Sequence, residues 1–293
     1  MKKSLISLIL LCVVLGMRAQ DLRFKDGKFK IVQFTDLHYK LGNPASKQAT
    51  DCMYEVVKAE NPDLIVLTGD VIYAKPGDAC LQQILNVLTD LKRPFCYLLG
   101  NHDPEQGIAV GKLYDQAAQN SFCVQPKRDG NVLDYVVPIK SGDGAKTAAV
   151  LYCMDTHAYC KMEDVGLYQW LSFDQIGRYR DWSAAFTKQN GGKPLPALMF
   201  MHYPLPEYDE AVTNNQVPLY GIRLEKNCSP CLNSGMFTAL KEGGDVMGVF
   251  CGHDHDNDYS TMYYQVLLAY GRFSGGNTEY NHLRNGARII VLY

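Results

Sequence analysis

Five short polar motifs, each placed directly after an apolar stretch, constrain the fold of this chain more than any other feature. They are Asp36-Leu-His38, Gly69-Asp70, Gly100-Asn101-His102-Asp103, Met201-His202 and Gly252-His253-Asp254-His255. Together they contain five of the seven histidines of the chain. Because open α/β sheets gather functional groups just beyond the carboxyl ends of their strands, the pattern predicts that carboxylate, amide and imidazole groups converge at one place.

The apolar stretches before the first three motifs alternate with helical patterns. Strands are expected at residues 30–35, 63–68 and 94–99, and helices at 46–60 and 78–91. The middle strand is continuously apolar, which is typical of a strand covered on both faces. A β-α-β-α-β order implies parallel strands with right-handed crossovers, so the sequence predicts an α/β fold.

The rest of the chain is less regular. Two strands, 132–138 and 147–153, are expected around a glycine-rich turn, and a capping box at Ser172-Phe-Asp-Gln175 predicts a helix to about residue 188. Further strands are expected at 196–201, 246–251, 263–270 and 287–292, with a short helix at 233–241. Residues 204–234 are rich in Pro, Asn and Gly, and we interpret them as a long surface loop near the site.

The first 19 residues have the layout of a secretory signal peptide. Lys2 and Lys3 form a basic start, residues 5–15 are apolar, and Ala19 offers a small residue for cleavage. An uncleaved membrane anchor is the alternative, but the apolar run is shorter than the about 20 residues that a span needs, and no second span follows. We therefore expect an exported protein, periplasmic or extracellular, with one domain over residues 21–293 and no stable membrane span after signal removal.

The charge balance argues against some partners. The formal net charge is −2, and removal of the signal peptide takes away three basic side chains and no acidic one. A mildly acidic surface does not favour non-specific binding to nucleic acid or to anionic lipid.

The cysteines are spread along the chain. Of the ten, Cys228-Ser-Pro-Cys231 is the only close pair, and in an exported protein it can form a tight disulfide. Cys96, Cys153 and Cys251 lie in apolar strands and are expected to be buried thiols.

The spacing within the motifs suits metal binding. In an extended segment residues i and i+2 point the same way, so Asp36 and His38 are expected to hold one ion from the same side, and His253 and His255 have the same spacing. Carboxylate, imidazole and amide ligands without sulfur suit zinc, iron or manganese. Because such ions lower the pKa of bound water to about 7, the sequence predicts metal-assisted hydrolysis, with a phosphate ester as the expected substrate.

In this order the motifs resemble the calcineurin-like metallophosphoesterase family, whose pattern is D-x-H, GD, GNH(D/E), a lone H and GHxH. The resemblance covers nearly the whole mature chain, and residues 29–38, 202–207 and 233–255 resemble the purple-acid-phosphatase-like branch. It implies an α/β metallophosphoesterase fold, a four-layer α-β-β-α sandwich with two mixed β-sheets. It also implies hydrolysis of a small-molecule phosphate ester by metal-hydroxide attack, with a phosphomonoester favoured and a diester possible.

The resemblance further implies two metal ions, divalent or mixed-valence, with Fe, Zn or Mn as candidates. One ion would be held by Asp36, His38, Asp70 and His255, and the other by Asn101, His202 and His253, with Asp70 bridging the two. True purple acid phosphatases use a tyrosine at the position of Tyr73 and lack the histidine of D-x-H, so Tyr73 is the alternative ligand and His38 the favoured one.

Two neighbours of the ligands are the candidate catalytic residues. His102 directly follows a ligand, so its side chain diverges from the metal and is expected to face substrate, where it can protonate the leaving oxygen. Asp103 is expected to fix the tautomer of His102.

The sequence allows two interpretations of His157 and of Arg272. His157 can line the pocket with Asp155 or lie in a surface turn, and Arg272 can bind phosphate or belong to a plain turn. Asp254 and Asp256 are expected to point away from the histidines between them.

Two other functions compete with this interpretation. A metallo-β-lactamase-like site needs H-x-H-x-D-H, and the residues after His255 do not fit it. A non-catalytic metal- or ligand-binding protein on the same scaffold is the alternative from a different class.

Overall fold

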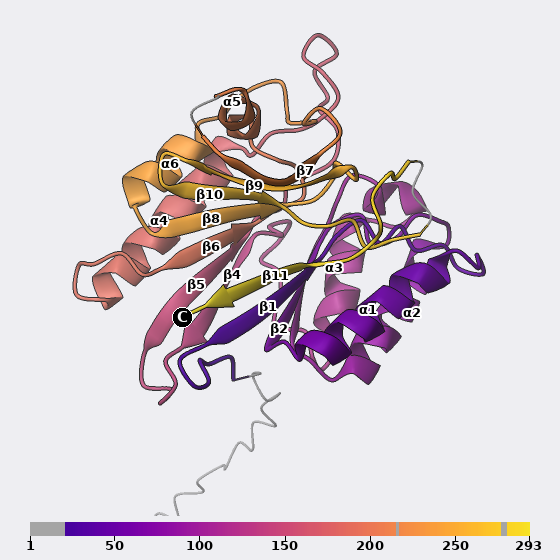
Figure 1. The fold of residues 1–293 in the computed structure, drawn as a ribbon, viewed down its shortest axis with the longest axis horizontal. Coiled ribbons are helices and arrows are strands. Elements are labelled where there is room, and N and C mark those ends of the chain that lie inside the picture. The colour runs from indigo at the N-terminus through magenta and orange to yellow at the C-terminus, as the bar shows by residue number, and fades with distance from the viewer. Residues whose placement is uncertain (1–20, 215–216, 277–279) are drawn as a thin grey trace, which may run out of the picture.

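The computed structural model describes residues 21–214, 217–276 and 280–293. The expected signal peptide lies outside these ranges. Two mixed β-sheets face each other, and helices cover their outer sides (Figure 1). This arrangement confirms the predicted four-layer α/β sandwich.

The small sheet carries the first three motifs. Its strands are β1 (Phe29–Phe34), β2 (Leu64–Thr68), β3 (Phe95–Leu98) and β11 (Arg288–Leu292), in the order β11-β1-β2-β3. The first three are parallel, and β11 runs antiparallel to β1. Helices α1 (Ser46–Glu60) and α2 (Gly77–Leu91) make the crossovers, and all of β2 is buried. The predicted β-α-β-α-β unit is confirmed.

The large sheet carries the last two motifs. Its order is β4-β5-β6-β8-β10-β9-β7, in which β5, β6, β8 and β10 are parallel. The strands are β4 (Tyr135–Lys140), β5 (Thr147–Cys153), β6 (Ala197–Phe200), β7 (Leu219–Arg223), β8 (Val246–Cys251), β9 (Asn257–Tyr263) and β10 (Val266–Tyr270). The remaining helices are η1 (Asp103–Gln106, a 3-10 helix), α3 (Val110–Ala118), α4 (Phe173–Gln189), α5 (Glu207–Thr213) and α6 (Met236–Gly243). The capping box at Ser172 is present as predicted.

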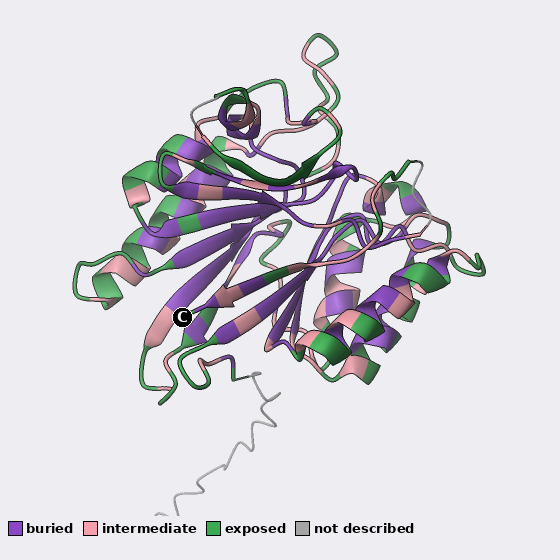
Figure 2. Cartoon of the chain, viewed as in Figure 1, coloured by how far each residue is buried: buried purple, intermediate pink, exposed green. Residues whose placement is uncertain are grey.

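The central strands of both sheets are largely buried (Figure 2). The side chains that alternate along them divide the interior into two cores. On β5, Leu151 and Cys153 join the core between the sheets, whereas Val150 and Tyr152 join the core under the helices of the large sheet. Fully burying a Leu- or Val-sized side chain contributes roughly 1.5–3 kcal/mol. The two cores hold the strand ends, and therefore the motifs, in fixed register.

Residues 204–234 correct the sequence interpretation. The segment is not one long loop, because it contains α5 and the edge strand β7. Every residue of β7 is exposed, so burial left no alternating pattern to detect. Residues 263–270 are likewise not one strand. Tyr264 and Gln265 both have positive φ and form the turn between β9 and β10, although neither is a usual turn residue.

Two further observations concern the expected membrane spans and the state of the cysteines. Among the described residues no helix is both long enough and apolar enough to cross a bilayer. Cys96, Cys153 and Cys251 are buried thiols as predicted, while Cys228 and Cys231 are both free, so the optional disulfide is not formed in this structure.

Candidate metal centre

The five motifs meet where the carboxyl ends of the parallel strands of the two sheets come together. Backbone hydrogen bonds join them: Asp36 N donates to Gly69 O at 3.1 Å, and Gly252 N donates to His202 O at 3.0 Å. His253 N donates to Asp36 Oδ2 at 3.0 Å, which ties the two sheets together across the site. The predicted convergence is therefore present.

Two of the junctions leave no room for a side chain. A Cβ on Gly100 would lie 2.2 Å from Asp70 Oδ1, and a Cβ on Gly252 would lie 1.9 Å from Thr35 Oγ1. These separations are far below van der Waals contact, so glycine is required for the loops to approach so closely.

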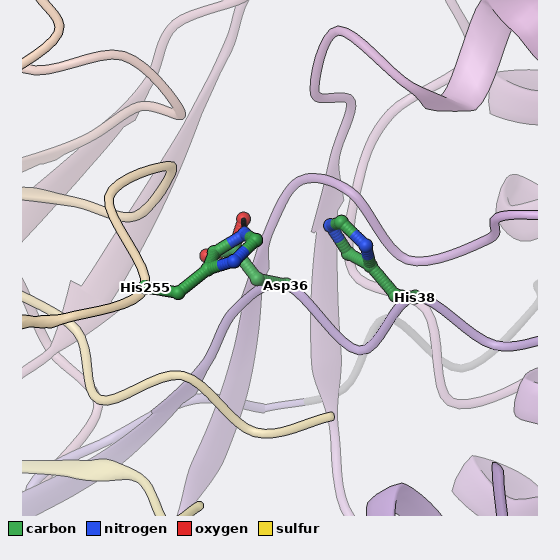
Figure 3. Close-up of side chains that lie close together, drawn as sticks. All are labelled: Asp36, His38 and His255. Atoms are coloured by element: carbon green, nitrogen blue, oxygen red, sulfur yellow. Dashed lines mark ion pairs between the residues drawn. The ribbon is translucent and has the colours of Figure 1, made fainter. Parts of the chain in front are cut away.

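Side chains from these loops form two buried clusters that can each hold a metal ion. In the first, ligand atoms of Asp36, His38 and His255 all lie within 4.8 Å of one another (Figure 3). Figure 3 shows His255 and His38 approaching from opposite sides of Asp36. The second cluster joins Asp70, His202 and His253 under the same criterion.

The local backbone differs from the extended geometry expected of D-x-H. Asp36 has φ 53° and His38 has φ 46°, so both are left-handed rather than extended. Their side chains nevertheless reach the same cluster. The two histidines of the last motif separate, because His255 faces the first cluster and His253, with φ 77°, faces the second. The expectation that residues i and i+2 point the same way along an extended backbone is therefore wrong for both motifs.

One carboxylate oxygen lies between the two clusters. Asp70 Oδ2 is 3.5 Å from His38 Nε2 and 3.3 Å from His202 Nε2. Asn101 joins the second cluster, because its Oδ1 lies 3.0 Å from His202 Nε2. This is the placement that a bridging carboxylate and an amide ligand require.

The polar atoms that face these clusters fit bound cations. Within the described chain, four buried atoms have no hydrogen-bond partner and point into the site: Asp36 Oδ1, His38 Nε2, Asp70 Oδ2 and His253 Nε2. A buried unsatisfied polar atom costs about 1–3 kcal/mol. Metal ions at the two clusters would satisfy all four.

Two carboxylates and one imidazole of these clusters are in the charge state that a metal ion requires. Burial opposes ionisation of Asp36, but the hydrogen bond and charge of His255, together with the charge of His202, outweigh it and lower the pKa of Asp36 to about 2. Burial likewise opposes ionisation of Asp70, and His202 and His38 lower its pKa well below the usual value. Burial lowers the pKa of His253 to about 3, so this imidazole is neutral and its lone pair is available to a metal.

Outer hydrogen bonds orient two of the histidines. His202 Nδ1 lies 2.9 Å from the Thr68 carbonyl oxygen, and His255 Nδ1 lies 3.3 Å from the Tyr280 carbonyl oxygen. Because a carbonyl only accepts, each Nδ1 carries the proton in these contacts and each Nε2 is turned to the clusters.

Asp103 does not contact the imidazole of His102, so the expected tautomer role is wrong. Its carboxylate accepts hydrogen bonds from the backbone N–H groups of Asp70, Val71 and Ile72 at 3.0 Å each. It also accepts one from Gly100 N at 2.7 Å. Through these four hydrogen bonds the Asp103 carboxylate holds the second and third motifs together. Glu105, which sequence reasoning missed, contacts the His102 ring instead, with Oε2 2.8 Å from Nδ1.

Tyrosine rings whose position the sequence did not predict pack against the histidines of both clusters. The Tyr73 ring packs 4.6 Å from the His38 ring and 4.7 Å from the His102 ring, measured between centroids. On the other side, Tyr168 and Tyr203 lie 4.6 Å and 4.7 Å from His253. Tyr168 comes from an irregular segment between β5 and α4, where no periodic signal could have indicated it.

Arg272, Asp254 and Asp256 have hydrogen-bond partners outside the two metal clusters. Arg272 Nε donates to Asp258 at 2.8 Å, so its guanidinium is engaged in an ion pair. Asp254 accepts hydrogen bonds from Cys228 N at 3.0 Å and from Tyr270 OH at 2.6 Å, and Asp256 accepts one from His282 N at 2.6 Å. Both carboxylates point away from the metal clusters, as expected.

His157 belongs to a separate polar network. Its Nδ1 lies 3.2 Å from Asp155 Oδ2 and its Nε2 lies 3.0 Å from Gln175 Oε1. The Asp155 carboxylate raises the pKa of His157 from 6.5 to about 9.

Asp155→Asn is therefore expected to lower the pKa of His157 toward 6.5, which NMR titration of the imidazole protons measures. The pair stabilises the fold fully below about pH 6.5 and loses that contribution as the pH rises through about 9. A His157 pKa that stays near 9 in the variant would show that another group sustains it.

Comparison with known proteins places this centre in a family. A family model described as calcineurin-like phosphoesterase matches residues 29–257. The chain is 30% identical over 314 residues to "Probable inactive purple acid phosphatase 14" of Arabidopsis thaliana, covering 92% of this chain and 78% of that protein. It is 30% identical over 276 residues to "Phosphatase DCR2" of Saccharomyces cerevisiae, covering 82% of this chain and 46% of that protein.

A solved structure shares the fold. A dimetal phosphatase from Danio rerio superposes with a TM-score of 0.63 at 13% identity, covering 90% of this chain and 93% of that chain. At this level of identity the likeness concerns the fold alone.

Proposed function

The chain belongs to the calcineurin-like phosphoesterase family, and from that premise we propose that it is a dinuclear-metal enzyme that hydrolyses a phosphate ester. A phosphomonoester is the favoured substrate and a phosphodiester the second. The observation that carries the proposal is the pair of buried clusters with Asp70 Oδ2 between them.

Seven side chains would hold the two ions. We assign Asp36, His38, Asp70 and His255 to one ion and Asn101, His202 and His253 to the other, with Asp70 shared. Iron, zinc and manganese suit this donor set. His38 lies in the first cluster, which supports it over Tyr73 as the ligand. When bound, such ions lower the pKa of water to about 7 and stabilise charge on the phosphoryl group.

His102 supplies the proton for the leaving group in this proposal. Its side chain is 21% exposed, whereas the side chains of both clusters are buried, so it lies at the mouth of the site. As the oxygen of water joins phosphorus, the ester P–O bond breaks and the leaving oxygen takes the Nε2 proton of His102. A proton of the attacking water then replaces it on the imidazole. The products are an alcohol and phosphate.

A non-catalytic binding protein is the second candidate, and an observation about relatives favours keeping it. The names of two relatives from Arabidopsis thaliana contain the word "inactive". In this chain, however, all five motifs are complete and both clusters are assembled. The intact ligand set supports the enzyme.

A substrate panel tests the proposal. The purified protein, analysed for metal, is incubated with phosphomonoesters, nucleotides, phosphodiesters and phosphosugars, and released phosphate or alcohol is measured. We expect turnover of at least one phosphomonoester. A protein that holds two metal ions and turns over none of the four classes would support the binding protein instead.

We also propose that the protein is exported and cleaved after Ala19. The basic start, the short apolar run and the small residue at the boundary support this proposal. Intact-mass analysis of the secreted or periplasmic protein is expected to show a chain that begins at or near Gln20. Recovery from the cytosol of a chain that begins at Met1 would contradict export.

A further inference from the structure

A short chain of hydrogen bonds links two residues that are neighbours in sequence. The His102 ring contacts Glu105 through Nδ1 and Oε2 at 2.8 Å. The other oxygen of Glu105 accepts a hydrogen bond from Tyr159 OH at 2.7 Å. The same hydroxyl accepts one from Asn101 Nδ2 at 3.1 Å. The path thus starts at Asn101, passes through Tyr159 and Glu105, and ends on the adjacent residue His102.

The Tyr159 end of this path settles the orientation of an amide. Asn101 Nδ2 is engaged by the hydroxyl, so Oδ1 is the amide atom that lies 3.0 Å from His202 Nε2 in the second cluster. Only the oxygen of an amide has a lone pair to offer a cation. Without the hydroxyl, nothing in this path would prevent the amide from rotating its NH₂ group toward the site.

The Glu105 end settles the orientation of the imidazole. The Glu105 carboxylate accepts a hydrogen bond from Nδ1–H and so leaves Nε2–H, the proton that His102 donates, as the group that faces outward. The ring is also held edge-on, 5.4 Å from the His38 ring and 4.7 Å from the Tyr73 ring between centroids. Asp103 is not available for this task, because its oxygens accept four backbone N–H groups.

We propose that Glu105 and Tyr159 form a positioning pair that sets two groups at once, the His102 imidazole and the Asn101 amide. The inference rests on the proposed function and deepens it. Glu105 acts through His102 on protonation of the leaving group, and Tyr159 acts through Asn101 on the hold of one metal ion. Because the two residues are hydrogen-bonded to each other, the proton donor keeps a fixed position relative to the metal site.

The Glu105 half is tested by the dependence of rate on the leaving group. In Glu105→Ala, hydrolysis of an alkyl phosphate is expected to fall about 10- to 100-fold, within the range of general acid catalysis, while a nitrophenyl phosphate loses at least tenfold less. Glu105→Gln keeps an oxygen that accepts from Nδ1 and is expected to recover part of the alkyl rate. The metal content of both variants is expected to stay at the wild-type level.

The Tyr159 half has a readout that does not need activity. In Tyr159→Phe, titration of the metal-free protein with Zn²⁺ against a competing chelator is expected to show one of the two ions bound at least tenfold more weakly, as losses of outer hydrogen bonds do. The ring is retained, so only the hydroxyl is removed.

Matched controls separate these effects from general loss of charge or of a hydroxyl. Glu55→Ala on α1 and Tyr220→Phe on β7 remove the same groups at exposed positions away from the motifs. Both are expected to match the wild type in the leaving-group ratio and in the Zn²⁺ titration.

The outcomes distinguish this inference from the proposed function. If the metal-loaded wild type hydrolyses no ester of the substrate panel, the proposed function fails, and the Zn²⁺ titration still decides the Tyr159 half. If the wild type is active but Glu105→Ala slows both esters equally, or Glu105→Gln recovers nothing, the role of Glu105 is overturned. Unchanged affinity for both ions in Tyr159→Phe overturns the role of Tyr159.

Discussion

Asp70→Asn is expected to lose activity and to weaken the binding of both metal ions. Asp70 Oδ2 lies within 3.5 Å of a histidine nitrogen from each cluster, so one substitution affects both sites. A neutral amide removes a negative charge from between two cations. At 4 Å and an effective dielectric constant of 20, a pair of unit charges interacts by about 4 kcal/mol, which corresponds to affinity lower by on the order of 10³-fold.

Metal analysis after dialysis, together with the rate on a nitrophenyl phosphate, measures this effect. Asp181→Asn, which removes a carboxylate from the exposed face of α4, is the matched control and is expected to keep two ions. Two full equivalents of metal in an active Asp70→Asn protein would refute the bridge. A loss confined to one ion would place Asp70 in a single site.

His102→Ala is expected to slow hydrolysis of alkyl phosphates by about 10²- to 10⁴-fold, the range of general acid catalysis. With a nitrophenyl phosphate the loss should be much smaller, because that leaving group departs readily as an anion. Metal content should remain at two, since the imidazole is assigned to the leaving group and not to an ion.

The comparison of the two esters is what makes this substitution informative. Equal losses for both would mean that His102 positions the phosphoryl group rather than protonating the leaving oxygen. A collapse of metal content would mean that the imidazole supports the metal site. His282→Ala, which removes an exposed imidazole paired with Asp256, is the control and should change neither rate nor metal content.

Periodicity predicted the parts of the fold in which burial repeats. The continuous apolar run of β2 and the stripe of α2 were visible in the sequence because both elements pack against a core. The edge strand β7 was not visible, since all five of its residues are exposed and carry no alternation. The turn between β9 and β10 was missed because Tyr264 and Gln265 are held at positive φ by strand pairing rather than by their own preference.

The candidate site likewise has features that the sequence predicted and features that only the structure shows. The motifs indicated which residues converge, and the structure brings all of them together. Their local geometry did not follow from spacing, because Asp36 and His38 are left-handed and His253 and His255 serve different clusters.

The hydrogen-bond partners of His102 depend on tertiary placement alone. Asp103 is taken by backbone N–H groups, and Glu105 takes its place at the imidazole. Tyr159, which is 54 positions from Glu105, carried no sequence signal for its contact.

We propose that this chain uses two metal ions at the paired clusters to hydrolyse a phosphate ester. The most direct test is the rate of phosphate release from a nitrophenyl phosphate while the metal-free protein is titrated with Zn²⁺, Mn²⁺ or Fe²⁺. We expect little turnover up to one equivalent and a rise in rate as the second equivalent binds. Two equivalents bound tightly, with no turnover for any of the three metals, would contradict it.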